Sequence, residues 1–237
     1  MFKGKKAVFF DMDGTLIDSV GVWNDVDRAL ISLLGGNPEK EDVQAQRDSK
    51  LREFAGCESP YTEYCGYLGK KYGSSLGGEE IMKKRYEIAQ DFLKNVVDYK
   101  EDADRFLHML KDAGYIIAVV STTRRKNMEV YINHNVNMKA KAPVEKTFDK
   151  IYTREDASVM KPDPEIYLKA LSDFGLDADE CIVFEDSLIG IEASTAAGID
   201  TISIYDKYSD EDMDKIIEMS SSHFRNYREV IAAFESE

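Results

Sequence analysis

Cysteine and histidine are both scarce in this chain, with three of each among 237 residues. The cysteines are odd in number, are far apart and form no C-x-x-C pair, so the sequence predicts neither a disulfide framework nor a zinc site. The histidines are equally isolated, and we expect them to be packing or surface residues. The cysteines stand at positions 57, 65 and 181, and the histidines at 108, 134 and 223.

Long hydrophobic runs are also missing. No segment approaches the ~18 consecutive apolar residues that are typical of a membrane-spanning helix. The amino terminus has no apolar signal region, although Lys3, Lys5 and Lys6 lie close to it. We therefore expect a cytoplasmic protein with no membrane partner.

Positive charge is in deficit, because 31 lysines and arginines face 45 aspartates and glutamates, for a net charge of -14. This surplus of negative charge opposes broad contact with nucleic acid or anionic lipid. We expect no nucleic-acid partner. A small anionic ligand stays compatible with the composition, provided that basic groups gather locally around it.

The chain has ample material for a packed core, since 43% of its residues are hydrophobic. Short apolar runs predict buried strands, and amphipathic segments that end at glycine predict helices between them. This alternation is typical of a parallel sheet covered by helices on both faces. We expect strands near residues 7–10, 115–120, 148–152, 181–184 and 201–204, and helices near 102–112, 164–174, 187–197, 210–219 and 227–234.

Residues 20–97 interrupt this pattern directly after the first strand. They contain helical segments separated by glycine-rich loops and no convincing strand. The sequence therefore predicts an α/β fold with a Rossmann-like, three-layer core made of residues 1–19 and 98–237, and an inserted all-helical cap domain over 20–97. We expect a monomer. The segment 126–147 allows no assignment from its pattern.

Two carboxylates at the end of the first strand are the most informative feature. Asp11 and Asp13 lie one residue apart, directly after the apolar run Ala7–Phe10 and before Gly14. The carboxyl end of a strand is where an open α/β sheet binds its ligands. Two like charges so close together repel, and a divalent cation is the usual compensation.

Three further strand ends bring polar side chains to the same edge of the predicted sheet. Hard oxygen ligands suit a magnesium ion, and hydroxyl and ammonium donors suit the oxygens of a phosphoryl group. The combination predicts a site for a phosphate and a magnesium ion (Mg2+). The contributing residues are Ser121 and Thr122, then Lys161, then Glu185 and Asp186.

Together these motifs resemble those of the haloacid dehalogenase (HAD) superfamily, in its phosphatase and β-phosphoglucomutase-like branch with a helical cap. The resemblance spans nearly the whole chain. It rests on four motifs in matching order: residues 11–19, Ser121 after its strand, residues 161–165, and Glu185-Asp186-Ser187 with Gly190. Met160 departs from the pattern, because the family commonly has glycine there.

The resemblance implies a magnesium-dependent phosphomonoester hydrolase that acts on a small phosphorylated metabolite. In that family Asp11 would attack phosphorus and become an aspartyl phosphate, and Asp13 would protonate the leaving group and then deprotonate water. Ser121, Thr122 and Lys161 would hold the phosphoryl oxygens. The cation would be held by Asp11, the main-chain carbonyl of Asp13, Glu185 and Asp186.

Structural interpretations exist for the same residues. Ser121 could cap the next helix, Lys161 could be a solvated lysine, and Glu185 and Asp186 could interact with a helix dipole. Each is reasonable alone, whereas the four motifs together favour the catalytic interpretation.

Other activities also stay open. A phosphomutase uses the same aspartyl phosphate, but mutases of this branch carry a cap histidine, and residues 20–97 contain none. A 2-haloacid dehalogenase would not need Asp13 or a metal, and a non-catalytic ligand-binding protein would not need intact catalytic residues. The physiological substrate has no recognisable motif, because specificity in this architecture depends on the cap.

Overall fold

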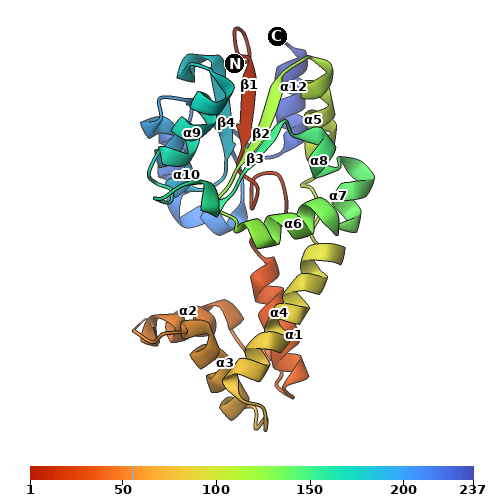
Figure 1. Cartoon of the computed structure of the whole chain (residues 1–237), viewed down its shortest axis with the longest axis vertical. Helices are drawn as coiled ribbons and strands as arrows, with labels where there is room; N and C mark the ends of the chain where they lie inside the picture. Colours follow the sequence, from red (N-terminus) through yellow and green to blue (C-terminus); the bar gives the residue numbers. More distant parts are fainter. Residues whose placement is uncertain (55) are drawn as a thin grey trace. The chain divides into compact units, whose positions relative to one another are not determined.

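The computed structural model describes residues 1–54 and 56–237. Contacts along the chain divide it into two compact units, drawn in Figure 1: a core unit of Met1–Val20 with Val97–Glu237, and a helical unit of Gly21–Val96. We propose that these units correspond to the discontinuous core and the inserted cap of the predicted domain organisation. Each unit is described here by itself.

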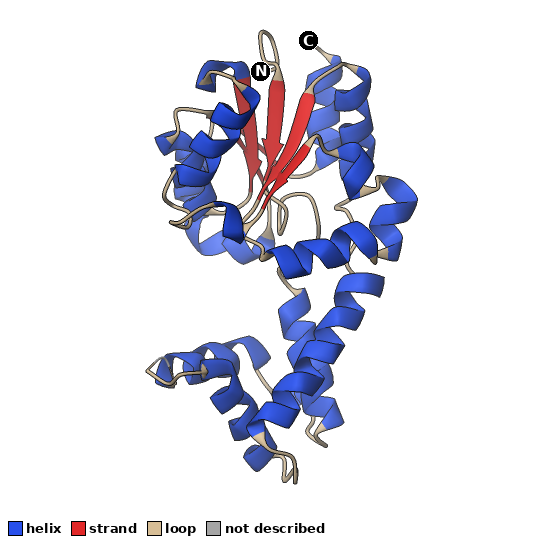
Figure 2. Cartoon of the chain, viewed as in Figure 1, coloured by secondary structure: helices blue, strands red, loops and turns tan. Residues whose placement is uncertain are grey.

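The core unit is built on a six-stranded sheet with the strand order β3-β2-β1-β4-β5-β6. Every neighbouring pair of strands is parallel. This arrangement, with helices on both faces, confirms the predicted Rossmann-like α/β fold class (Figure 2). The strands are β1 Ala7–Phe10, β2 Ile116–Val120, β3 Lys150–Tyr152, β4 Cys181–Glu185, β5 Asp200–Ile204 and β6 Ser222–Phe224.

Helices connect these strands and cover the sheet. In Figure 1, α9 and α10 lie on one side of the sheet, and α5 and α12 lie on the other. The α-helices of the core unit are α5 Ala103–Asp112, α6 Arg125–Asn133, α7 Val136–Lys141, α8 Val144–Thr147, α9 Glu165–Phe174, α10 Leu188–Ala196, α11 Met213–Met219 and α12 Tyr227–Glu235. Short 3-10 helices are η2 Arg154–Asp156, η3 Ala178–Glu180 and η4 Lys207–Asp212.

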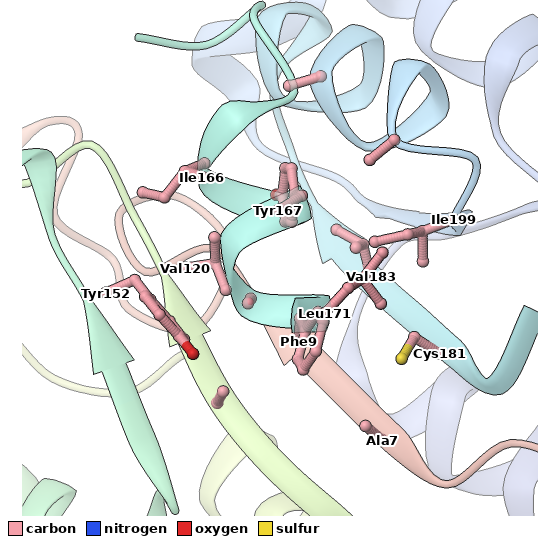
Figure 3. Close-up of a cluster of buried hydrophobic side chains, with 14 residues drawn as sticks. Ala7, Phe9, Val120, Tyr152, Ile166, Tyr167, Leu171, Cys181, Val183 and Ile199 are labelled. Atoms are coloured by element: carbon pink, nitrogen blue, oxygen red, sulfur yellow. The ribbon is translucent and has the colours of Figure 1, made fainter. Parts of the chain in front are cut away.

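Strand β1 is apolar at every position because both of its faces are buried. On one face, Phe9 stacks on Phe174 at the end of α9, with ring centroids 5.9 Å apart, and belongs to the cluster drawn in Figure 3. On the other face, Phe10 meets Phe106 of α5 at 6.3 Å. Burial on both faces holds β1 rigidly at the centre of the sheet, so the residue after it is placed accurately.

The helical unit has a hydrophobic core of its own. Tyr64, Leu68 and Ile81 are fully buried in it, and Asp27 of α1 forms a buried ion pair with Arg85 of α4 at 2.6 Å. Its helices are α1 Val22–Leu33, η1 Pro38–Lys40, α2 Val43–Glu53, α3 Pro60–Lys71 and α4 Gly78–Asn95. No helix in the described part of the chain is long and apolar enough to cross a membrane.

The structure adds two features that the sequence pattern did not predict. The segment 126–147 consists mainly of α6, α7 and α8, of which the last two have only six and four residues. A sixth strand, β6, pairs with β5 through Ile202 and Ser222, although its side chains are mostly polar. Both features depend on tertiary contacts more than on periodicity.

Candidate active site

Asp11 follows the last residue of the central strand. In the sheet register, Phe10 of β1 pairs with Val119 of β2 and with Phe184 of β4. The residues after these, Val120 and Glu185, therefore lie beside Asp11 at the carboxyl edge of the sheet. The predicted convergence of strand ends is present in the structure.

Gly14 ends this segment with a conformation that L-residues rarely adopt, at φ 85°. A Cβ atom there would lie 2.4 Å from Oδ2 of Asp186. Glycine is therefore required for two reasons: the chain turns sharply, and the Asp186 carboxylate packs against its backbone. Thr15 then donates a hydrogen bond from Oγ1 to Oδ1 of Asp186 at 2.7 Å.

Three buried carboxylates meet at this edge. One oxygen from each of Asp11, Glu185 and Asp186 lies within 4.8 Å of the others, and all three side chains are buried. The carboxylate of Asp13 is not one of this group; it points to a separate set of partners. The carboxylates of Asp11 and Asp13 therefore have different partners, although the two residues lie one residue apart in the sequence.

Lys161 lies among these carboxylates. Its Nζ donates hydrogen bonds to Oδ1 of Asp11 at 2.8 Å, to Oε1 of Glu185 at 2.7 Å and to the carbonyl of Val120 at 3.0 Å. The ammonium also lies 4.9 Å from the ring centroid of Tyr167. A lysine with 2% of its side chain exposed is stable as a cation only with such partners.

Burial and like charge set the electrostatics of the cluster. Burial raises the pKa of Asp11 to about 7, while Lys161 acts against this increase. Burial, followed by the charges of Glu185 and Asp11, also raises the pKa of Asp186 well above its usual value. Burial disfavours the charged form of Lys161, yet Asp11 and Glu185 outweigh it and raise its pKa well above the ordinary value. The cluster is short of positive charge.

Glu185 is held against the first turn of α10. Its Oε2 accepts hydrogen bonds from the main-chain N–H groups of Asp186 at 3.0 Å and Ser187 at 3.2 Å, and from the Ser187 hydroxyl at 3.1 Å. A Cβ atom on Gly190 would lie 1.8 Å from Oε1 of Glu185. The glycine of the fourth motif therefore makes room for this carboxylate.

Asp13 accepts hydrogen bonds from three hydroxyl groups. Ser19 donates to Oδ1 at 2.5 Å, Tyr131 donates to the same oxygen at 3.3 Å, and Thr123 donates to Oδ2. Burial, followed by the charge of Asp13, raises the pKa of Tyr131 well above its usual value, so this hydroxyl keeps its proton. The three donors come from the turn after β1, the loop after β2, and α6.

The two other predicted phosphate ligands lie after β2. Ser121 is 1% exposed, and its Oγ accepts a hydrogen bond from the main-chain N–H of Thr123 at 3.2 Å. Thr122 lines a small cavity, and Lys161, Arg154 and Met160 are among the other residues that line it. The side chain of Thr123, which the sequence analysis did not select, is the one that reaches Asp13. A phosphate-binding role for Ser121 and Thr122 stays a prediction.

The sequence analysis gave several polar residues of this site no role in it, among them Thr15, Thr123, Tyr131 and Tyr167. Thr15 stands within the first motif, so its place beside Asp13 and Gly14 was the available signal. Tyr167 lies two residues beyond the third motif on α9, and its hydroxyl lies 3.4 Å from Glu185. Tyr131 had no sequence signal, because only the fold brings α6 to Asp13.

The acidic cluster fits a divalent cation. Three carboxylates and one ammonium leave two uncompensated negative charges when all are ionised. Carboxylate oxygens are the hard ligands that such cations prefer. Burial is the main cause of the raised pKa of Asp186, and the negative charges of Glu185 and Asp11, which a bound cation would offset, add to it. Asp11, Glu185 and Asp186 can therefore hold a metal ion.

Comparison with known proteins finds relatives that are named as phosphatases. Among curated relatives, the chain is 26% identical over 202 residues to a bifunctional riboflavin kinase/FMN phosphatase of Arabidopsis thaliana, covering 85% of this chain and about half, 49%, of that protein. It is 26% identical to a phosphorylated carbohydrates phosphatase of Thermotoga maritima, covering 83% of each chain.

Among solved structures, the fold matches a putative β-phosphoglucomutase from Thermotoga maritima with a TM-score of 0.74 and 23% identity, covering 98% of this chain and 99% of that one. The family model described as haloacid dehalogenase-like hydrolase matches residues 8–204, which include Asp11, Lys161 and Asp186. The chain therefore belongs to the haloacid dehalogenase-like hydrolase family.

Proposed function

We propose that this protein is a magnesium-dependent phosphomonoester hydrolase that acts on a small phosphorylated metabolite through an aspartyl phosphate on Asp11. The observation that carries the proposal is the buried cluster in which Lys161 bridges Asp11 and Glu185 beside Asp186. Asp11, the ammonium of Lys161 and a set of carboxylates suited to a metal ion thus lie at one edge of one sheet. Relatives named as phosphatases support the same reaction class.

Asp11 is suited to act as the nucleophile. Lys161 holds Oδ1, which leaves Oδ2 as the oxygen that we expect to attack phosphorus. In the first step, an Oδ2–P bond forms as the bond from phosphorus to the leaving oxygen breaks. In the second step, the oxygen of a water molecule attacks phosphorus, the Asp11–phosphate bond breaks, and inorganic phosphate is released.

Asp13 is suited to move the protons of both steps. It would give its proton to the leaving alkoxide in the first step and take one from the attacking water in the second, so that it ends in its starting form. Its carboxylate lies outside the metal cluster and has hydroxyl partners only among its described contacts. Among these contacts, Asp13 is therefore not committed to an ion pair.

Asp11, Glu185 and Asp186, with the main-chain carbonyl of Asp13, would hold the magnesium ion. When bound, the ion would supply positive charge that brings the anionic phosphate up to the anionic nucleophile. Lys161 and Ser121 would stabilise the charge on the transferring oxygens. Phosphorylated carbohydrates are the first substrates to test, because one relative is named for them.

The test is phosphate release by purified protein from a panel of phosphorylated metabolites, in magnesium and in chelator. We expect magnesium-dependent release that Asp11→Asn abolishes. Asp200→Asn is the matched control: Asp200 opens β5 at the opposite end of the sheet and pairs with Lys5. Equal release by Asp11→Asn, or release that chelator does not affect, would contradict the proposal.

A second measurement addresses the intermediate. With p-nitrophenyl phosphate, Asp13→Asn should give a burst of about one equivalent of p-nitrophenolate followed by slow turnover, because water attack would lack its base. Interconversion of hexose phosphate isomers without phosphate release would instead identify a phosphomutase.

A further inference from the structure

The segment 126–147 contains a tyrosine that reaches the first motif. Tyr131 lies on α6, is 2% exposed and donates its hydroxyl proton to Oδ1 of Asp13 at 3.3 Å. The two residues are 118 positions apart in the chain. A buried tyrosine hydroxyl needs a hydrogen-bond partner, and here the partner is the proposed proton-transfer group.

The segment that carries Tyr131 is anchored beside the first motif. Asn135 and Asn137, which follow α6, both donate from Nδ2 to the carbonyl of Val97, at 2.9 and 3.1 Å. Tyr99 donates to the carbonyl of Ala142 at 2.7 Å, and Tyr99 also forms a β-bridge with Ile17. The turn that carries Asp13 and the segment that carries Tyr131 are therefore tied to the same short stretch of chain.

The donors around Asp13 restrict how its carboxylate can act. A carboxylate has about four lone-pair sites for hydrogen bonds. Ser19 and Tyr131 together occupy Oδ1, and Thr123 occupies part of Oδ2. The site left on Oδ2 is then the one that can carry a transferred proton. Without Tyr131, Oδ1 would keep only Ser19, and the carboxylate could rotate so that the proton points away from the leaving group.

We propose that Tyr131 is a positioning residue, which holds the Asp13 carboxylate in the orientation required for proton transfer to the leaving group. This inference rests on the proposed function, since it concerns the first step of that reaction. Among the hydrogen bonds of the described residues, Tyr131 has none to the proposed phosphate ligands or to the carboxylates of the acidic cluster. The loss of kcat/KM on removal of the Tyr131 hydroxyl should therefore be larger for esters whose leaving group must be protonated.

The experiment compares Tyr131→Phe with the unchanged protein on esters whose leaving groups differ. Phenylalanine keeps the buried ring and removes the hydroxyl. For alkyl phosphates, kcat/KM should fall about tenfold, the size expected for one lost hydrogen bond to a charged group. For p-nitrophenyl phosphate, kcat/KM should stay within about twofold, because p-nitrophenolate leaves without a proton.

Tyr99→Phe is the matched control, because it removes a buried tyrosine hydroxyl that donates to Ala142 of the same segment and, among the hydrogen bonds of the described residues, has none to Asp13. It should change both classes of ester alike or neither. An equal loss on both classes in Tyr131→Phe would overturn the proposal, since it would indicate a structural role. An unchanged kcat/KM on alkyl phosphates would overturn it as well.

A crystal structure of Tyr131→Phe keeps the proposal testable apart from turnover. A rotated or disordered Asp13 carboxylate would support the positioning role, and an unmoved one would contradict it. If the unchanged protein released no phosphate from any ester, the proposed function would fail, while this structure would still decide whether Tyr131 orients Asp13.

Discussion

Replacing Lys161 by methionine should destabilise the core unit strongly when no divalent cation is present. Methionine keeps the length of the side chain and removes the charge. The three carboxylates at the sheet edge would then have no internal cation, although Asp11, Glu185 and Asp186 are all buried. Leaving such charges without a partner is among the most unfavourable changes that a single substitution can make.

The magnitude follows from the distances. Each contact from the ammonium, 2.8 Å to Asp11 and 2.7 Å to Glu185, is worth ~6 kcal/mol by Coulomb's law at an effective dielectric of ~20. Desolvation of the charges offsets much of this attraction. Removal of one partner from a buried ion pair costs about 3 to 5 kcal/mol, and we expect Lys161→Met to fall in that range.

The assay is urea denaturation followed by far-ultraviolet circular dichroism, in chelator and in magnesium. We expect a large loss of stability in chelator that magnesium partly restores, because a bound cation would supply the missing charge. Lys111→Met is the matched control: Lys111 forms an exposed pair with Asp149 at 3.4 Å, and its loss should cost less than about 1 kcal/mol.

One result would refute this reasoning. If Lys161→Met in chelator unfolded within about 1 kcal/mol of the unchanged protein, the ammonium would not be what makes the buried carboxylates tolerable. The charge argument would also be contradicted if magnesium raised the free energy of unfolding of Lys161→Met by less than it raises that of the unchanged protein.

Three further predictions concern other parts of the core and helical units. Gly190→Ala should lower the free energy of unfolding by about 1 to 3 kcal/mol and lower activity, because its Cβ would displace Glu185. In the same denaturation assay, the control Gly66→Ala on α3, where the atom nearest to the new Cβ would be 3.7 Å away, should instead stabilise the protein slightly. Lys150, followed by Tyr152, lowers the pKa of Asp173 to about 2, so the stability gained from Asp173 should be present above the ordinary carboxyl pKa of ~4 and be lost as the pH falls through ~2. The free energy of unfolding of Asp173→Asn should therefore differ from that of the unchanged protein at pH 6, and the difference should approach zero below pH ~2. Asp186→Asn should weaken magnesium binding by at least about tenfold in calorimetry, since it removes one of the three carboxylates proposed as ligands, and equal affinity would argue against this cluster as the metal site.

The residues at strand ends were predictable because a simple rule places them. Apolar runs identified β1, β2 and β4, and parallel strands bring their carboxyl ends to one edge. Asp11, Lys161 and Glu185 therefore meet as the spacing of elements suggested. What periodicity could not indicate is that Lys161 bridges two of the carboxylates, since that depends on side-chain distances within the folded site.

The remaining contacts escaped prediction for physical reasons. Helices α7 and α8 are too short to show a hydrophobic period, and Asn135 stabilises α7 by accepting from the N–H of Met138, a local capping contact. Strand β6 is polar because it is the edge strand beyond β5. Tyr131 meets Asp13 only through the packing of these short elements, which no single stretch of sequence encodes.

The point where the chain leaves the core unit and the point where it returns are hydrogen-bonded to each other. The N–H of Asp18 donates to the carbonyl of Asp98 at 3.1 Å, and Ile17 bridges Tyr99. The core unit therefore holds residues 17–18 and 98–99 together, whatever chain lies between them. Because the entropic cost of closing a loop grows only slowly with its length, a longer or shorter insert should change the stability of the core unit little. The helical unit is therefore joined to the core unit at a point where the core closes on itself, and we expect a graft between residues 20 and 97 to leave Asp11, Glu185 and Asp186 at the ends of their own strands.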